Sequence, residues 1–595
     1  MIEPIAISLK TQVQEIDSVI HYWVAMPQPE THLFEVTLHL VGYPLPILDL
    51  KMPVWTPGSY LVREYAKNVQ DFAAFAGANP LNWRKISKNH WQVEKGDASE
   101  VILRYRVFAN ELSVRTNHLD ATHGYFNGAA LFLRIPGWEK RPVNITIIPP
   151  HHEWKVTTGL PSVTEEANTF CAADFDTLVD TPFEIGSHDL YHFDVLGIPH
   201  ELAIWGKGNC QPQKMLEDFQ KIIEFEAQMF GGLPYQRYVF ILHLFKQEAY
   251  GGLEHKNSSS LIYHRLGFRG QDKYEKFIQL VAHEFFHLWN VKRIRPKALE
   301  VFDYDQENYT QSLWFCEGTT SYYDLIIPFR AGVYDIKSYF HHLNQEITKY
   351  LKTPGRKVQP LSESSFDAWI KLYRPDPNSG NSQISYYLKG EMVSLLLDLL
   401  IRSRHGNQRS LNDVMSKMWA QFGQAEIGYT PEQLKEVIES VAGIDLSDFF
   451  NRYIQGLDDL PFNEYLEPFG LQLVEEFEFE PYLGVKIKTE NGREIIKFVE
   501  MGSPANTAGI DAGDELLAID GIKVGTSQLS ERLKDYQPGE TINITVFHHD
   551  ELRNYSVTLA KQHPIKYELR PVENPDPIQQ ANFCGWLGVP LSTIK

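Results

Sequence analysis

The sequence predicts a multidomain α+β protein, because its hydrophobic pattern changes twice along the chain. Apolar and polar residues alternate in short runs through the first part, which predicts strands with Pro/Gly turns between them. From about residue 195 long segments of helical period dominate, and after about residue 470 short strands return. A chain of 595 residues is long enough to bury several separate cores.

These patterns divide the chain into four segments: a β-rich N-terminal domain (1–170), a strand-edged, mainly helical domain (171–465), a second β-rich domain (466–565) and a C-terminal tail (566–595). Alternation is clearest at residues 34–40, 101–107 and 143–148. Helices are predicted at about 272–292, 309–327, 386–404, 430–442 and 446–455. Thr430, Pro431 and Gln433 have the positions of an N-cap, an N1 proline and a capping-box partner.

Composition excludes several classes of function. With 56 basic and 76 acidic residues the net charge is −20, which argues against binding of nucleic acid. Four widely spaced cysteines form no C-x-x-C pair, so neither a thiolate zinc knuckle nor a disulfide scaffold is expected. The longest apolar run, 393–401, is too short to span a membrane, and the first ten residues lack the pattern of a signal peptide. We therefore expect a cytoplasmic protein without a membrane partner.

The segment His283-Glu284-Phe285-Phe286-His287 is a candidate metal motif. On a helix, residues i and i+4 project from the same face, so His283 and His287 can hold one ion. The apolar residues of this helix fall on the opposite face, which fits a metal helix packed into a domain. The bare motif arises by chance in about one such chain in twenty. A solvated helix with two incidental histidines is therefore the alternative.

A hydrolytic zinc ion takes three protein ligands and keeps one position open for water. The Gly and His that a metzincin needs downstream are replaced by Asn290 and Arg293. Candidate carboxylates are Glu300, Glu307 and Glu317. We favour Glu317, because it lies in an apolar helical segment where an unpaired carboxylate is costly. Two imidazoles and a carboxylate also accept cobalt or manganese.

This donor set predicts metal-assisted peptide hydrolysis. Glu284 points to the side of the two histidines, where it can take the proton of water and pass it to the leaving amine. The oxyanion needs a second electrophile, for which Tyr386 and Tyr387 are candidates that spacing alone does not separate. Residues 55–65 (WTPGSYLVREY) form a distinctive turn-rich stretch to which the sequence assigns no chemistry.

The chain resembles the PDZ-containing glycyl aminopeptidases, gluzincin zinc metallopeptidases related to aminopeptidase N. HEFFHLWNVKRIRP (283–296) matches that family beyond the zinc motif, and LWFCEG (313–318) resembles its third-ligand segment. The resemblance implies a thermolysin-like catalytic domain with one Zn²⁺ held by His283, His287 and Glu317. YLKG (387–390) resembles the segment whose tyrosine binds the oxyanion, which favours Tyr387.

GGLEH (251–255) resembles the clan's Gly-x-Met-Glu-Asn motif, whose glutamate binds the free amino group of the substrate. Glu254 is the matching residue, while Leu253 and His255 depart from the pattern. A fixed carboxylate near the metal is also what recognition of an ammonium group requires. The resemblance thus implies release of N-terminal residues, with small ones such as Gly or Ala preferred.

Residues 502–521 strongly resemble a PDZ domain, and Tyr482, Leu483, Gly484 and Val485 resemble its carboxylate-binding loop. Consecutive backbone N–H groups of such a loop can hold the C-terminus of a peptide. A PDZ fold with a blocked groove is an equal alternative. The preferred interpretation is a zinc aminopeptidase acting on peptides. The alternatives are a zinc endopeptidase that recruits substrates through its PDZ groove, and an inactive PDZ adaptor.

Overall fold

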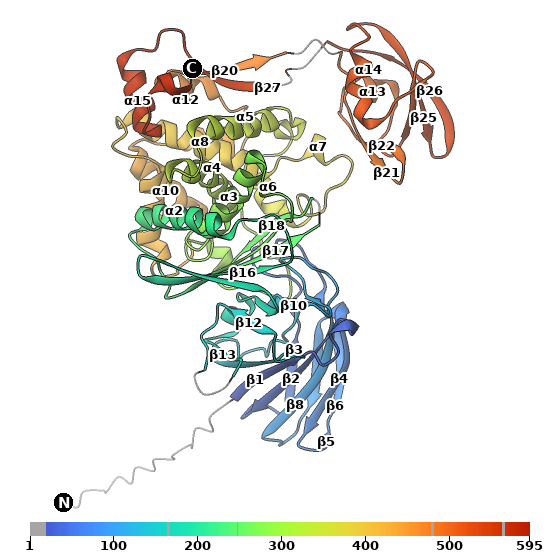
Figure 1. The fold of residues 1–595 in the computed structure, drawn as a ribbon, viewed down its shortest axis with the longest axis vertical. Coiled ribbons are helices and arrows are strands. Elements are labelled where there is room, and N and C mark those ends of the chain that lie inside the picture. The colour runs from blue at the N-terminus through green and yellow to red at the C-terminus, as the bar shows by residue number, and fades with distance from the viewer. Residues whose placement is uncertain are drawn as a thin grey trace, which may run out of the picture.

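The computed structural model describes residues 19–163, 167–246, 248–477, 481–561, 564 and 566–594. Figure 1 shows β-sheets at the N-terminal end, a mainly helical middle part, and a separate β module formed late in the chain. Each of these parts contains its own large cluster of buried apolar side chains. The predicted multidomain α+β class is therefore confirmed.

The N-terminal part is built on a seven-stranded sheet in the order β13-β11-β1-β2-β8-β4-β5. Central strands β2 and β8 bury every second residue, as expected for strands with one face on a core. The strands are β1 (Val19–Ala25), β2 (Leu33–Val41), β4 (Val69–Ala76), β5 (Asn79–Pro80), β8 (Glu100–Phe108), β11 (Val143–Ile148) and β13 (Thr169–Ala172). The alternation predicted at 34–40, 101–107 and 143–148 is thus confirmed.

Two smaller sheets complete this part. One has the order β3-β7-β6 and the other β12-β14-β10-β9. Their strands are β3 (Ile47–Lys51), β6 (Asn82–Ser87), β7 (His90–Glu94), β9 (His118–Leu119), β10 (His123–Phe126), β12 (Lys155–Thr158) and β14 (Phe183–Gly186), and helix α1 spans Phe175–Val179. The second of these sheets lies next to the middle part of the protein in Figure 1.

A five-stranded sheet lies between the N-terminal sheets and the helices (Figure 1). Its order is β15-β16-β17-β19-β18, so that β18 is the last strand of this sheet among the described residues, antiparallel to β19. The strands are β15 (Asp189–Val195), β16 (Ile198–Trp205), β17 (Tyr238–Phe245), β18 (Tyr250–Glu254) and β19 (Ser258–His264). Glu254 is therefore the last residue of an edge strand.

Helices of the middle part cover this sheet. They are α2 (Pro212–Phe230), α3 (Gln271–Phe286), α4 (Thr319–Arg330), α5 (Ile336–Leu351), α6 (Leu361–Phe366), α7 (Ser379–Ser382), α8 (Tyr386–Arg404), α9 (Leu411–Met418), α10 (Pro431–Ala442), α11 (Ser447–Phe449) and α12 (Phe462–Leu466). Helix α8 confirms the predicted 386–404, and α10 has the predicted capping box. Helix α3 packs against α4 and against strand β18.

Three predicted helices differ from the structure. The helix predicted at 272–292 ends at Phe286, because the chain turns back at Val291, whose φ is 111°, and Asn290 bridges to Ile294. The helix predicted at 309–327 begins instead as a π turn at Trp314–Gly318 and continues as α4. π turns also occur at Trp419–Gly423 and Phe450–Ile454, the second of them inside the helix predicted at 446–455. Hydrophobic period does not distinguish such turns from α-helix.

The C-terminal β module has the strand order β21-β22-β23-β25-β26. Its elements are β21 (Val485–Glu490), β22 (Arg493–Val499), α13 (Pro504–Ala508), β23 (Glu515–Ile519), β24 (Ile522–Lys523), α14 (Leu529–Leu533), β25 (Thr541–His548) and β26 (Glu551–Thr558). Asn381 on α7 ties the module to the helices, because its amide donates to the carbonyl of Val499 (3.0 Å) and accepts from the N–H of Met501 (2.9 Å).

The chain returns to the helices after this module. Strand β27 (Lys566–Pro571) pairs with β20 (Leu471–Glu476). Strand β20 precedes the module in the sequence, and β27 follows it. Helix α15 (Pro577–Leu587) then buries Phe583 and Trp586 in the core of the middle part. No helix among the described residues is both long and apolar enough to cross a bilayer.

Candidate metal centre

Helix α3 and the π turn bring three sequence-predicted ligands together. Nε2 of His283 lies 3.4 Å from Oε2 of Glu317, and Nε2 of His287 lies 3.0 Å from the same oxygen. Candidate ligand atoms of these three residues all lie within 4.8 Å of one another. Glu300 lies elsewhere, since it pairs with Lys297 and accepts the N–H of Gly428.

The outer nitrogens of both histidines are already engaged. Nδ1 of His283 lies 2.8 Å from Oδ2 of Asp324 on α4, and Nδ1 of His287 donates to the carbonyl of Asn290 at 2.7 Å. These contacts fix the tautomer in which Nε2 is free of hydrogen and can bind an ion. Metal-binding histidines characteristically donate their second nitrogen in this way. Asp324 was not identified from the sequence.

Asn290 also holds the π turn that carries the third candidate ligand. Its side-chain amide donates to the carbonyls of Phe315 (2.9 Å) and Cys316 (3.1 Å). Helix α8 crosses the same turn so closely that a Cβ on Gly318 would lie 2.5 Å from Cα of Gly390. The carboxylate that follows Cys316 is thereby fixed opposite the two imidazoles.

The chemistry of this group fits a divalent metal ion. Burial by itself would raise the pKa of Glu317, but the two imidazoles outweigh it and lower that pKa to about 2. An ionised carboxylate, only 2% exposed, thus faces two imidazole nitrogens. Two imidazoles and one carboxylate suit zinc and also accept cobalt or manganese.

Glu284 lies beside this group rather than in it. It is buried, its Oε2 has no hydrogen-bond partner, and burial raises its pKa to about 7. Gly252 of strand β18 passes directly over it, and a Cβ at that position would overlap the Glu284 carboxylate. Glu284 can occupy this place only because Gly252, the second glycine of the pair in β18, has no side chain.

Glu254 is the last residue of strand β18 and lies beside the candidate metal group. Ligand atoms of Glu254, Glu284 and His287 all lie within 4.8 Å of one another. The side chain of Glu254 is 4% exposed, and its Oε1 has no hydrogen-bond partner. Such a buried, unpaired carboxylate oxygen is costly unless a cation completes it.

The N-terminal part contributes residues that the sequence did not assign. Gly58 lies in the turn-rich stretch 55–65, has a φ of 84°, and touches Glu254 so closely that a Cβ would lie 2.5 Å from its Oε1. Tyr60 is buried in the same region, and the charges of Glu317 and Glu254 add to the effect of burial in raising its pKa. The only signal in the sequence was a Pro-Gly turn among large aromatic residues.

Arg115 is a second unassigned residue at the site. It belongs to the connection between β8 and β9, and its Nη2 donates to the carbonyl of Gly252 at 3.1 Å. Burial opposes the charge of this guanidinium, but nearby Tyr373, Tyr387, Glu284 and Glu254 raise its pKa. Arg115 thus places a fixed positive charge beside two carboxylates.

Of the two candidate tyrosines, Tyr387 lies closer to the metal group. Its ring stacks 6.1 Å from that of His283, and its hydroxyl lies 3.4 Å from the hydroxyl of Tyr373. Burial raises the pKa of Tyr387 well above the usual value, so its hydroxyl keeps its proton. Tyr386 is completely buried, and its hydroxyl also interacts with Tyr373.

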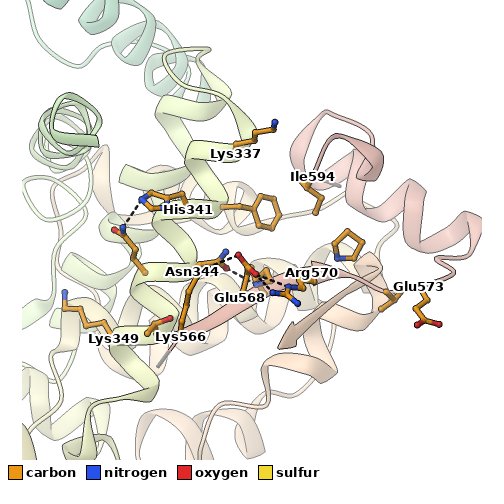
Figure 2. A pocket seen from close by; sticks show the side chains of 15 residues that line it. Lys337, His341, Asn344, Lys349, Lys566, Glu568, Arg570, Glu573 and Ile594 are labelled. Atoms are coloured by element: carbon orange, nitrogen blue, oxygen red, sulfur yellow. Dashed lines mark hydrogen bonds and ion pairs between the residues drawn. The ribbon is translucent and has the colours of Figure 1, made fainter. Parts of the chain in front are cut away.

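A cavity of about 210 Å³ reaches Glu254 from the junction with the N-terminal part. Gly58 and Tyr60 of the N-terminal part line it together with Lys256 and Lys292 of the middle part. A larger hollow of about 1020 Å³ lies between α5 and β27, where Figure 2 shows His341, Asn344 and Arg570 along its wall. None of the candidate metal or catalytic residues lines this second hollow.

Residues 482–485 lead into β21, the edge strand of the C-terminal module among the described residues. Leu483 is buried, and its carbonyl accepts the N–H of Ala505 at 3.1 Å. Gly484 has a φ of 84°, and its carbonyl accepts the N–H of Glu500 at 2.8 Å. The loop is thus held through its carbonyl groups.

Comparison with known proteins defines the class of protein. Three family models match the chain, described as the peptidase M61 N-terminal domain (21–187), M61 glycyl aminopeptidase (276–393) and PDZ domain (481–559). A solved structure of an aminopeptidase N family protein from Idiomarina loihiensis is 31% identical, with a TM-score of 0.90. The match covers 95% of this chain and 100% of that one.

A structure of an M1 zinc metallopeptidase from Deinococcus radiodurans is 13% identical, covering 75% of this chain and 94% of that one with a TM-score of 0.47. A search of curated proteins finds no match. The site and the family models define a metallopeptidase with a PDZ domain. More particularly, the chain belongs to the M61 glycyl aminopeptidase family, as the resemblance predicted.

Proposed function

We propose that this protein is a zinc-dependent aminopeptidase that hydrolyses the first peptide bond of peptides with a free N-terminus. The observation that supports it most is Glu254, whose buried and unpaired Oε1 lies beside the candidate metal group. An N-terminal ammonium group satisfies that oxygen and brings the first carbonyl next to the metal. An endopeptidase cleaves bonds far from a free amino group and therefore does not need a carboxylate at this position.

His283, His287 and Glu317 hold one Zn²⁺ per chain in this proposal. The ion, when bound, polarises the scissile carbonyl and lowers the pKa of water. Asp324 and the carbonyl of Asn290 each accept the Nδ1 hydrogen of one imidazole and so turn its Nε2 toward the ion. The matching donor set and these outer contacts support zinc, with cobalt and manganese as chemically acceptable substitutes.

Glu284 acts as the general base. Its carboxylate lies beside the metal group without a partner for Oε2, so it can take a proton from water and return it to the leaving amine. Tyr387 donates its hydroxyl proton in a hydrogen bond to the oxyanion that develops on the scissile carbonyl. Its raised pKa and its place beside the His283 ring support this role.

Small N-terminal residues such as Gly or Ala are the proposed preference. The description of the matching family model as M61 glycyl aminopeptidase supports this preference. For the C-terminal module we propose that Tyr482, Leu483, Gly484 and Val485 receive the C-terminus of a peptide that pairs with edge strand β21.

The decisive test compares a free peptide with its N-acetylated twin, using wild-type protein and Glu254→Gln. We expect wild type to cleave only the free-amine peptide, and Glu254→Gln to lose at least about 10-fold in kcat/KM on it, because a neutral amide pairs poorly with an ammonium group. Equal cleavage of both peptides by wild type would instead favour the endopeptidase. Peptide binding without any hydrolysis would favour the adaptor.

A further inference from the structure

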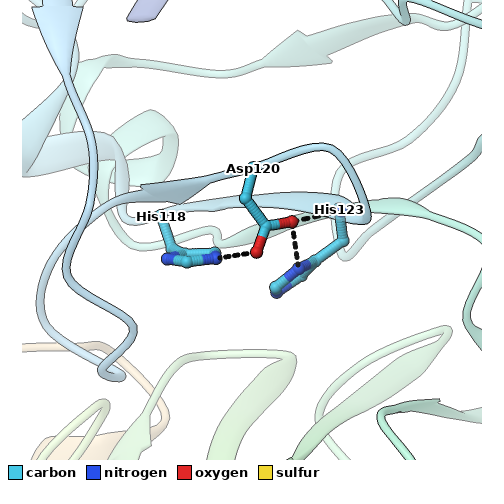
Figure 3. A group of neighbouring side chains, drawn as sticks. All are labelled: His118, Asp120 and His123. Carbon is cyan, nitrogen blue, oxygen red and sulfur yellow. Dashed lines mark hydrogen bonds and ion pairs between the residues drawn. The ribbon is translucent and has the colours of Figure 1, made fainter. Parts of the chain in front are cut away.

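A second group of metal-type ligands lies on the hairpin formed by β9 and β10. Figure 3 shows Asp120 at the tip of this hairpin, between the imidazoles of His118 and His123. Nε2 of His118 lies 3.1 Å from Oδ2 of Asp120, and Nδ1 of His123 lies 3.8 Å from Oδ1. Two imidazoles and one carboxylate, at similar separations, also make up the candidate catalytic centre.

The hairpin holds these side chains in place before any ion is present. The N–H and hydroxyl of Thr122 both donate to Oδ1 of Asp120, which fixes the carboxylate in a tight turn. The ring of His123 stacks on Trp205 of strand β16 with centroids 3.6 Å apart. A preformed arrangement of this kind lowers the entropy that an ion must overcome on binding.

Behind His123 lies a buried carboxylate. Glu184 on β14 is completely buried and lies within 4.8 Å of a nitrogen of His123 and of His243 on β17. Nε2 of His243 lies 2.8 Å from Oε2 of Glu184. Oε1 of Glu184 and Nε2 of His123 have no hydrogen-bond partner. Glu184 thus places a buried negative charge behind the ring of His123 without a direct hydrogen bond to it.

We propose that His118, Asp120 and His123 form a second binding site, for a divalent transition metal ion of the zinc class, separate from the hydrolytic centre. The outer set of ligands is favoured over Glu184 and His243 because its carboxylate is 33% exposed and can be reached from solvent. Glu184 and His243 stay outside the ligand set and lie behind the ring of His123. The donor set excludes calcium and magnesium, which prefer oxygen ligands.

The position of the site suggests a structural task. His118 follows Arg115 by only three residues, in the connection that reaches Gly252 above Glu284. Glu184 and His243 belong to the N-terminal and middle parts respectively, so the supporting carboxylate already joins the two parts. An ion bound at the hairpin stabilises the turn next to the loop that carries Arg115.

Metal counting on the full-length protein tests the proposal. Protein stripped with a chelator is given three equivalents of Zn²⁺, desalted, and analysed for bound metal and for melting temperature. We expect two ions per chain in wild type, one in Asp120→Asn, and one in the double variant His283→Ala, His287→Ala. In that double variant added Zn²⁺ should still raise the melting temperature, because binding stabilises the folded state alone.

Asp49→Asn is the matched control. Asp49 accepts from His90 at 2.8 Å, like Asp120 beside its histidines, but it belongs to no candidate metal group among the described residues. This variant should keep both ions, whereas Asp120→Asn, which preserves the turn through the asparagine side chain, should lose one. A single ion in wild type, or none in the His283→Ala, His287→Ala protein, would overturn the proposal. The second result leaves the proposed peptidase unaffected.

Discussion

Gly58→Ala is a sharp test of the role of Glu254, because the perturbed residue lies far from it in sequence and carries no chemistry of its own. An added Cβ would lie 2.5 Å from Oε1 and 2.6 Å from Oε2 of Glu254, and 2.7 Å from Cδ1 of Leu253. Ordinary contact begins near 3.4 Å. Either the carboxylate or the turn must therefore retreat by about 1 Å.

Two costs follow from this geometry. The φ of Gly58 is 84°, and a residue with a side chain in that region loses roughly 1–2 kcal/mol of stability. The displaced carboxylate no longer holds the ammonium group of the substrate at its proper distance, and a misplacement of about 1 Å can lower the rate by about 10²-fold. We thus expect a moderate loss of stability and a large loss of kcat/KM on free-amine substrates.

Gly137→Ala separates these two effects. Gly137 has a φ of 83°, but a Cβ there would meet nothing within 4 Å. Both variants are compared by urea denaturation and by hydrolysis of an alanyl anilide. Gly137→Ala should lose similar backbone stability with wild-type kcat/KM. If Gly58→Ala also retained wild-type kcat/KM, Glu254 would not be the residue that positions the substrate.

Three further changes probe the metal centre. Glu284→Gln should keep its metal but lose at least about 10²-fold in kcat, as expected for removal of a general base; unchanged turnover would exclude that role. Asp324→Asn should weaken metal affinity by about 10- to 100-fold, measured by competition with a chelator, because the carboxylate no longer orients His283. Asn290→Ala should reduce the free energy of unfolding by about 1–3 kcal/mol, since two carbonyls of the π turn lose their donor, and a denaturation midpoint equal to that of wild type would contradict this.

Local patterns in the sequence predicted much of the fold. The alternation at 34–40 and 101–107 and the capping box at Thr430 depend on neighbouring residues, and the structure has the expected elements. The end of α3 could not be predicted, because the backbone turn at Val291 depends on contacts with the π turn and not on helical period. The assignment of Glu317 over Glu300 used the cost of a carboxylate in an apolar segment. In the structure Glu317 faces the two imidazoles, and Glu300 accepts the N–H of Gly428.

The contribution of the N-terminal part to the site had no comparable signal. Gly58 and Arg115 reach Glu254 and Gly252 through the packing of two sheets that a single sequence does not specify. Asp324 was equally hidden, because one acidic residue on a helix has no pattern to mark it. A glycine inside an otherwise bulky stretch, as at residues 55–60, was the clearest available hint.

The central claim is a divalent ion held by His283, His287 and Glu317, and anomalous diffraction at the zinc edge from crystals of the protein tests it most directly. We expect a peak about 2.0–2.2 Å from Nε2 of both histidines and from a Glu317 oxygen. A map with the three side chains as described here, in zinc-loaded protein, but without a peak between them would contradict the account.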